Sequence, residues 1–217
     1  MKDLFKYAIG LFESYVNSFP DLSGMHKKNF RIKKNHCIRV ADNSLILGKS
    51  LTYDEDEINA MYIAGLFHDI GRFDQLFRYN TFNDEISLDH ADHSVKILTE
   101  KRLFDFLEPE KRNLILRSVQ LHNKFKVPGS LSGRELLHVR ALRDADKLDI
   151  LKVLTDYYLL RNGKPNHTLT WGMPAGIKVS PDVSNDILEG KLISKNKVKS
   201  EIDIKILQLS WVYDLNF

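Results

Sequence analysis

Apolar residues recur along the chain at the three- and four-residue spacing of amphipathic helices, with no sustained two-residue alternation. Asp89 or Ser87 can cap one of these helices, and the acidic run DEDE at residues 54–57 suits the start of another, because a helix N-terminus carries partial positive charge. The expected class is therefore all-α, with about six to eight helices joined by some long loops. The pattern predicts helices over residues 4–19, 36–49, 53–71, 88–101, 109–123, 132–161 and 201–216.

Two connections are long for a compact helical protein: Arg72 to Ile86, and Asn162 to about Asp182. Such loops are commonly lids or binding loops, although many only cover the surface. No repeat and no shift in composition marks a second domain, so one domain is expected over residues 1–217.

The composition is that of an ordinary globular protein: 43% of the 217 residues are apolar and 28% are charged. The net charge of +3 arises from 32 basic and 29 acidic residues spread along the chain, so it gives only weak support to nucleic-acid binding, and a nucleic-acid partner is not expected. A small anionic substrate is equally compatible with this charge.

The chain is expected to be cytoplasmic and free of membrane contact. Its longest apolar stretch, Ala60–Phe67, falls short of the roughly 18 residues that span a membrane. Asp3, Lys6 and Glu13 interrupt the N-terminal region where a signal peptide would be apolar. The single cysteine, Cys37, allows no intrachain disulfide and no thiolate zinc cluster, so we expect it to pack in the core.

Polar side chains that can bind metals lie on the apolar faces of five predicted helices. His36, for example, shares a face with Val40 and Leu47, and His90 with Ile97. Each alone could be a hydrogen-bonded core residue, but burying all of them without a cation would leave several polar groups unpaired. Four imidazoles and two carboxylates suit Fe, Mn, Zn, Co or Ni. The six residues are His36, His68, Asp69, His90, His122 and Asp146.

These residues, in this order, resemble the H…HD…H…H…D pattern of the HD-domain metal-dependent phosphohydrolases, in the form that holds two metals. The resemblance covers about residues 30–160. One departure is Ser94, where such proteins usually have glycine; serine is small enough to keep the close packing. The matching contexts are NHCIRVA, AGLFHDIGRF, DHADHSVKIL, VQLHNK and RDADKLDIL.

The resemblance implies an HD-type helical bundle with its core at about residues 30–160 and a C-terminal extension, residues 162–217, packed on it. It implies one metal held by His36, His68, Asp69 and Asp146. It further implies that Asp69 bridges to a second metal held by His90 and His122. Two divalent cations can share a hydroxide that attacks a phosphate ester or anhydride, such as that of a nucleotide. Asp69 and Lys147 are the expected catalytic residues.

Neighbouring cations are candidates to bind the substrate phosphate, although each could equally be a surface residue: Arg72, Lys124 and Lys147. Asp149 shares a face with Asp146, which makes it a better candidate than Asp144 or Arg143 to hydrogen-bond a ligand imidazole. His93 lies off the inward face and is expected to be exposed or beside a ligand. The aromatic side chains that could shape the substrate pocket, or simply pack in the core, are Tyr79, Phe82 and Trp171.

Two other functions stay open on the sequence. Di-iron oxygenases of the HD fold use the same order of ligands, so fold and ligands do not separate them from hydrolases. A non-catalytic domain that senses nucleotides could also keep the metals. The sequence leaves the substrate, the metal and the oligomeric state undetermined, and also whether the native chain continues past Phe217.

Overall fold

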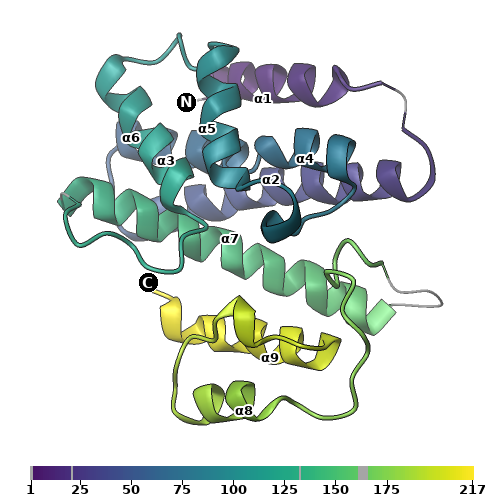
Figure 1. Ribbon diagram of the computed structural model, residues 1–217. Coiled ribbons are helices and arrows are strands. Elements are labelled where there is room, and N and C mark those ends of the chain that lie inside the picture. Colours follow the sequence, from purple (N-terminus) through teal and green to yellow (C-terminus); the bar gives the residue numbers. More distant parts are fainter. Residues whose placement is uncertain (1, 21, 132, 161–165) are drawn as a thin grey trace. The chain divides into compact units, whose positions relative to one another are not determined.

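The computed structural model describes residues 2–20, 22–131, 133–160 and 166–217. Within these ranges the chain forms α-helices and short 3-10 turns without a strand, which confirms the all-α prediction (Figure 1). The helices are α1 (Lys2–Asn17), α2 (Gly24–Ser50), α3 (Glu55–Phe67), α4 (Gly71–Tyr79), α5 (His90–Glu100), α6 (Pro109–Leu121), α7 (Gly133–Leu160), α8 (Pro181–Leu188) and α9 (Glu201–Ser210).

The chain divides into two compact units, Met1–Asp149 and Ile150–Phe217, with the boundary inside α7. All six candidate ligands belong to the first unit. The expected ends of the α7 helix, residues 132 and 161, lie outside the described residues. The organisation as one domain with a packed extension stays a prediction.

Helix α3 is the central element of the first unit. Asp54 caps its first turn by accepting a hydrogen bond from the Glu57 amide at 2.9 Å. Every residue from Ile58 to Phe67 is buried, as expected for a helix that is apolar on all sides. The helix packs against α1, α2 and α6. Its C-terminal end therefore delivers His68 and Asp69 into the interior of the protein.

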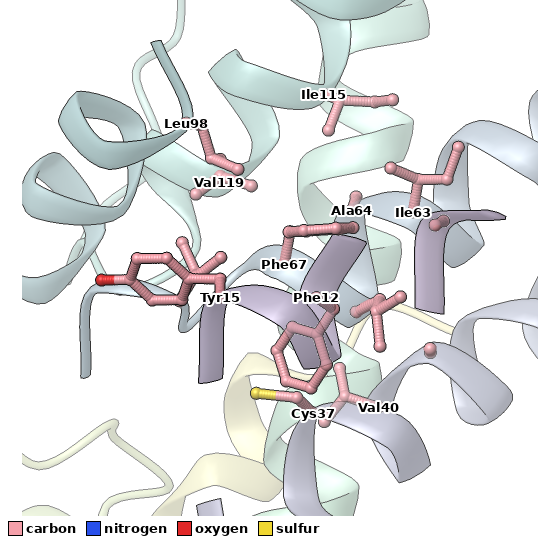
Figure 2. Close-up of a cluster of buried hydrophobic side chains, with 14 of the residues drawn as sticks. Phe12, Tyr15, Cys37, Val40, Ile63, Ala64, Phe67, Leu98, Ile115 and Val119 are labelled. Carbon is pink, nitrogen blue, oxygen red and sulfur yellow. The ribbon is translucent and has the colours of Figure 1, made fainter. Parts of the chain in front are cut away.

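The core around α3 consists of aliphatic and aromatic side chains from all the helices that surround it (Figure 2). The rings of Phe12 and Phe67 meet edge to face, with centroids 5.8 Å apart. Cys37 is completely buried in the same cluster, which confirms the prediction that it packs in the core. This packing fixes α2 directly beside α3, and His36 is the residue before Cys37.

Gly65 allows α2 and α3 to approach closely. A Cβ atom at this position would lie 2.8 Å from the Cα of Ala41 and 2.9 Å from the carbonyl oxygen of Val40. Both are backbone atoms, which cannot rotate away as a side chain could. Gly71 makes a similar contact with α5, and its amide donates a hydrogen bond to the Ser94 hydroxyl at 2.9 Å. Serine therefore fits the close packing at this position.

We expect Gly65→Ala to lower the free energy of unfolding by about 1–3 kcal/mol, because the added methyl group must push α2 and α3 apart. Urea unfolding followed by circular dichroism measures this loss. Gly10→Ala is the matched control: Gly10 is exposed within α1 and its Cβ would meet no atom within 4 Å. That change should stabilise the protein by about 0.5–1 kcal/mol. Equal effects of both substitutions would contradict the close-packing argument.

Two boundaries differ from the sequence prediction. The expected loop Arg72–Ile86 is wrong for its first half, because residues 71–79 form α4, with Phe73 and Leu76 buried. The expected third helix was predicted to end near Gly71, but α3 ends at Phe67, and a turn that contains His68 and Asp69 separates it from α4. Helix α2 begins twelve residues before the expected start at His36, in a lysine-rich segment that lacks a continuous apolar stripe.

The second unit has a small apolar core of its own, which includes Val183, Ile204 and Leu207. The buried Asp203 side chain accepts hydrogen bonds from the backbone amides of Ser180 and Lys199, at 2.7 and 2.9 Å. It thereby ties the start of α8 to α9. None of the helices described by the structure is long and apolar enough to cross a membrane.

Candidate metal centre

The structure brings together the six residues selected from the sequence. Helix α2 contributes His36 from its middle, and α7 contributes Asp146. His68 and Asp69 directly follow α3, while His122 directly follows α6. His90 is the first residue of α5. Their ligand atoms form two groups that share Asp69: His36, His68, Asp69 and Asp146 in one, and Asp69, His90 and His122 in the other.

In all four histidines, Nδ1 donates a hydrogen bond to an oxygen outside the two ligand groups. The Nε2 atom of each imidazole therefore points toward the centre of the site. The acceptors are carboxylates for two of the rings and backbone carbonyls for the other two. In the first group, His36 donates to Asp149 Oδ2 and His68 to the Gly65 carbonyl, each at 2.7 Å. In the second, His90 donates to Asp84 Oδ2 at 2.5 Å and His122 to the Val119 carbonyl at 2.6 Å.

A hydrogen atom on Nδ1 leaves the Nε2 of a neutral imidazole as a lone pair. The Nε2 atoms of His36 and His68 lie only 3.2 Å apart, and those of His90 and His122 only 3.1 Å apart. Two lone pairs at these distances repel each other unless a cation or a proton lies between them. The tautomers fixed by the outer oxygens therefore suit metal ligation on both sides.

The Asp69 carboxylate lies between the two imidazole pairs, with one oxygen toward each. Its Oδ2 is 3.2 Å from His68 Nε2 and 3.5 Å from His36 Nε2. Its Oδ1 is 3.3 Å from His90 Nε2 and 3.8 Å from His122 Nε2. A carboxylate in this orientation can bridge two cations.

Two buried oxygens in the centre lack a hydrogen-bond partner: Asp69 Oδ1 and Asp146 Oδ1. Buried polar atoms are normally satisfied, so these two call for a ligand. Asp146 Oδ1 also lies 3.1 Å from His36 Nε2 and 3.4 Å from His68 Nε2. Oxygen and imidazole donors without sulfur suit a divalent transition metal. The residues present thus fit the metals that the resemblance implies.

The charges of the metal-free centre follow from its burial and its carboxylates. Burial disfavours the ionised form of Asp69, but Lys33, His68 and His90 together hold its pKa well below its usual range. Burial also opposes protonation of His68, yet Asp69 and Asp146 raise its pKa to about 9. Burial and the neighbouring Arg72 lower the pKa of His90 to about 4. The half of the centre near His90 thus holds a neutral imidazole beside an ionised carboxylate.

Residues around the centre hold the second imidazole pair in place. Asp89 caps α5 by accepting from the amides of Ala91 and Asp92, both at 3.0 Å, which confirms one of the two expected caps. The guanidinium of Arg143 is buried and donates to the carbonyl of His122 at 3.0 Å.

In the first pair, Asp149 accepts a hydrogen bond from His36. This contact confirms the prediction that Asp149 is the better candidate to hydrogen-bond a ligand imidazole.

The cations expected near the substrate differ in their surroundings. Lys147 is buried and directly follows Asp146. Arg72 Nη1 donates to Asp84 Oδ1 at 2.6 Å, whereas its buried Nε has no hydrogen-bond partner and lies 3.6 Å from Asp69 Oδ1. Lys124 instead pairs with Asp89 at 2.7 Å, which ties the end of α6 to the start of α5. The role of these three cations in binding phosphate stays a prediction.

The remaining candidates lie outside the ligand groups. His93 Nε2 bonds to Asp74 Oδ2 at 2.7 Å, away from the six ligands. Tyr79 is about half exposed at the end of α4, and Trp171 belongs to the second unit, where Lys195 lies over its ring. Two cationic side chains of the site lie over the ring of Phe82, with Lys33 Nζ 5.7 Å and Arg72 Cζ 5.6 Å from its centroid.

Two residues of the site escaped the sequence reasoning. Lys33 forms an ion pair with Asp69 Oδ2. It lies three residues before His36 in α2, a spacing that places both on one helix face and could have identified it. Asp84 orients His90 and holds Arg72, but it lies in a 3-10 turn of the connection after α4. No periodicity marks a residue in such a turn.

The comparisons with known proteins agree with this geometry. The family model described as HD domain matches residues 34–151, which is more than half of the chain and includes all six candidate ligands. No curated protein and no solved structure matches the chain. The match and the two buried ligand groups lead to the same assignment. The chain belongs to the HD domain family.

Proposed function

We propose that the protein is a metal-dependent phosphohydrolase that binds two divalent cations and cleaves a small phosphate ester or anhydride, such as that of a nucleotide. The observation that carries the proposal is the orientation of Asp69, with one oxygen toward each pair of Nε2 atoms. His36, His68, Asp69 and Asp146 hold one cation, and Asp69, His90 and His122 hold the other. Iron, manganese, zinc, cobalt and nickel all suit these ligands.

Two cations in these positions would supply an activated water and neutralise charge on a phosphoryl group. The residues of the chain prepare the site for that chemistry. Asp69 provides an anionic bridge that a neutral imidazole cannot provide. We expect Lys147 and Arg72 to bind phosphate oxygens, and the buried Arg72 Nε, which has no hydrogen-bond partner, supports this role for Arg72. The buried position of His68 and His90 limits competing water around the ligands.

Metal analysis of the protein as purified, followed by a phosphate-release assay, tests the proposal. The assay uses a panel of nucleotides and dinucleotides, with each of the five metals restored in turn to metal-free protein. Phosphate release under anaerobic conditions with manganese is the expected result. Oxygen uptake with ferrous iron, without phosphate release, would assign the centre to oxygenase chemistry instead. Tight binding of a nucleotide that stays intact would indicate a sensing domain.

Asp84 and Asp149 each accept a hydrogen bond from a ligand histidine, and each should therefore control the affinity for one of the two cations. We expect Asp84→Asn to lower the affinity of the cation at His90 and His122 about 10–100-fold, because the charged acceptor that fixes the His90 tautomer is lost. Asp149→Asn should do the same for the cation at His36. Titration of metal-free protein with manganese, followed by calorimetry, measures both affinities.

The two single variants serve as controls for each other. Each should keep about one tightly bound ion per chain, and the double variant should keep none. If Asp84→Asn and Asp149→Asn both retained two ions of unchanged affinity, their carboxylates would have no part in orienting the ligands.

A further inference from the structure

The side chain of Lys33 is in direct contact with the candidate metal centre. It lies on α2, one helical turn before His36, and its ammonium pairs with Oδ2 of Asp69. The side chain is only 11% exposed. Among the residues that the structure describes, Asp69 is the one carboxylate with which Lys33 pairs. Lys33 therefore depends on that carboxylate for its counter-charge.

A metal at the first group would compete with Lys33 for this oxygen. The same Oδ2 lies 3.2 Å from His68 Nε2 and 3.5 Å from His36 Nε2, so it belongs to the ligand group that those imidazoles form. A divalent cation and an ammonium at one oxygen repel each other at short range, and a low-dielectric surrounding strengthens that repulsion. Metal binding should therefore displace the ammonium from Asp69.

A displaced Lys33 ammonium needs another anion, because an unpaired charge in a largely buried position is costly. The ring of Phe82, 5.7 Å from Nζ, provides only a weak cation–π contact. The other charged group over this ring, the guanidinium of Arg72, is itself a cation and is paired with Asp84. A substrate phosphate that enters the centre would supply such an anion.

We propose that Lys33 is a phosphate-binding residue, which pairs with Asp69 in the metal-free protein and with the substrate phosphate once the metals are bound. The proposal rests on the phosphohydrolase function and deepens it. Asp69 and Asp146 together cannot neutralise two divalent cations and an ammonium. The loaded centre therefore carries excess positive charge and favours a phosphate group with two negative charges, as in a phosphate monoester or the terminal phosphate of a nucleotide. A phosphodiester carries only one.

The test uses Lys33→Met in the full-length protein loaded with manganese, with inorganic phosphate as the probe. We expect phosphate to bind at least about tenfold more weakly than to the parent protein, because a charge-assisted contact is lost. Manganese affinity of the metal-free variant should stay equal or increase, because the competing ammonium is gone. A residue with only a structural role would not weaken phosphate binding while it improved metal binding.

Lys34→Met is the matched control, since Lys34 is the next residue of α2 but pairs with Glu13 on α1 at 2.8 Å. It should change neither affinity. Lys33→Arg keeps the charge and should keep phosphate binding within a few-fold, which also covers the case that the methionine variant fails to fold. A second comparison sets inorganic phosphate against dimethyl phosphate, a monoanion, which the parent protein should bind more weakly.

The outcomes separate this inference from the proposed function. If the parent protein bound no metal, both would fail. If it bound two ions, but phosphate affinity were absent or were the same in Lys33→Met, only the role of Lys33 would be overturned. Loss of manganese from Lys33→Met, with Lys33→Arg equally impaired, would likewise overturn it, because Lys33 would then support the metal ligands rather than compete with a metal.

Discussion

Asp69→Asn should lower the rate of hydrolysis at least about a hundredfold, the scale expected when a group that acts on transition-state charge is removed. The asparagine side chain keeps the size of aspartate but loses its negative charge. One oxygen of Asp69 faces His36 and His68, and the other faces His90 and His122. A neutral amide, with a single oxygen, cannot serve both sides. The measurement is kcat for a substrate found in the phosphate-release assay, together with the metal content.

Asp74→Asn provides the matched control for this substitution. Asp74 also pairs with a histidine, His93, at 2.7 Å, and its side chain is largely buried, but it lies outside both ligand groups. We expect this variant to keep its metals and at least about half of the parent rate. If Asp69→Asn hydrolysed the substrate at the parental rate with two metals still bound, the bridging role of Asp69 would have to be abandoned.

The sequence was sufficient to predict the fold class and to select the six residues that the structure brings together as candidate ligands, because both depend on local spacing. Apolar residues at helical intervals define most of the helices. A histidine on an apolar face, such as His36, stands out against its neighbours without knowledge of the partner helices. The order of these residues along the chain then matches a family pattern, and the family model matches the same region.

The structure was needed where a contact depends on distant parts of the chain. Helix α4 has only nine residues and follows α3 after a turn at Asp69. Its apolar pattern is too short to distinguish a helix from a loop, so the sequence predicted a loop there. The start of α2 is rich in lysine, and Asn29 and Phe30 are the residues buried there before His36. Tertiary contacts, such as the edge-to-face pair of Phe30 and Phe73, hold this segment in place.

The partners of the ligands were also hidden for this reason. Asp84 is six residues before His90 in sequence, yet only the turn between α4 and α5 brings its carboxylate to the imidazole. Lys124 was expected at the substrate because it follows His122 by two residues. In the structure its ammonium pairs with Asp89 and Asp92. The sequence spacing did not reveal these two acidic partners, and a role of Lys124 in binding substrate stays a prediction.

Removal of the metals should lower the melting temperature of the protein by about 8–16 °C for each ion lost. An ion bound only by the folded state stabilises it by mass action, by about 4 kcal/mol when the free metal is a thousand times its dissociation constant. For a protein of this size, each kcal/mol corresponds to roughly 2–4 °C. Without cations, the paired Nε2 atoms and the unpartnered oxygens of Asp69 and Asp146 stay buried together.

Differential scanning calorimetry with and without a chelator measures this change. The melting transition of the first unit should shift, because that unit contains all six candidate ligands. A chelator saturated with calcium beforehand controls for effects of the chelator itself. The Asp69→Asn variant, if it binds less metal, should respond correspondingly less. Restoring manganese should restore the original melting temperature. A melting curve that did not change, although metal analysis showed complete loss of the ions, would mean that the cluster of four imidazoles and two carboxylates is stable without them, and the dinuclear centre would have to be given up.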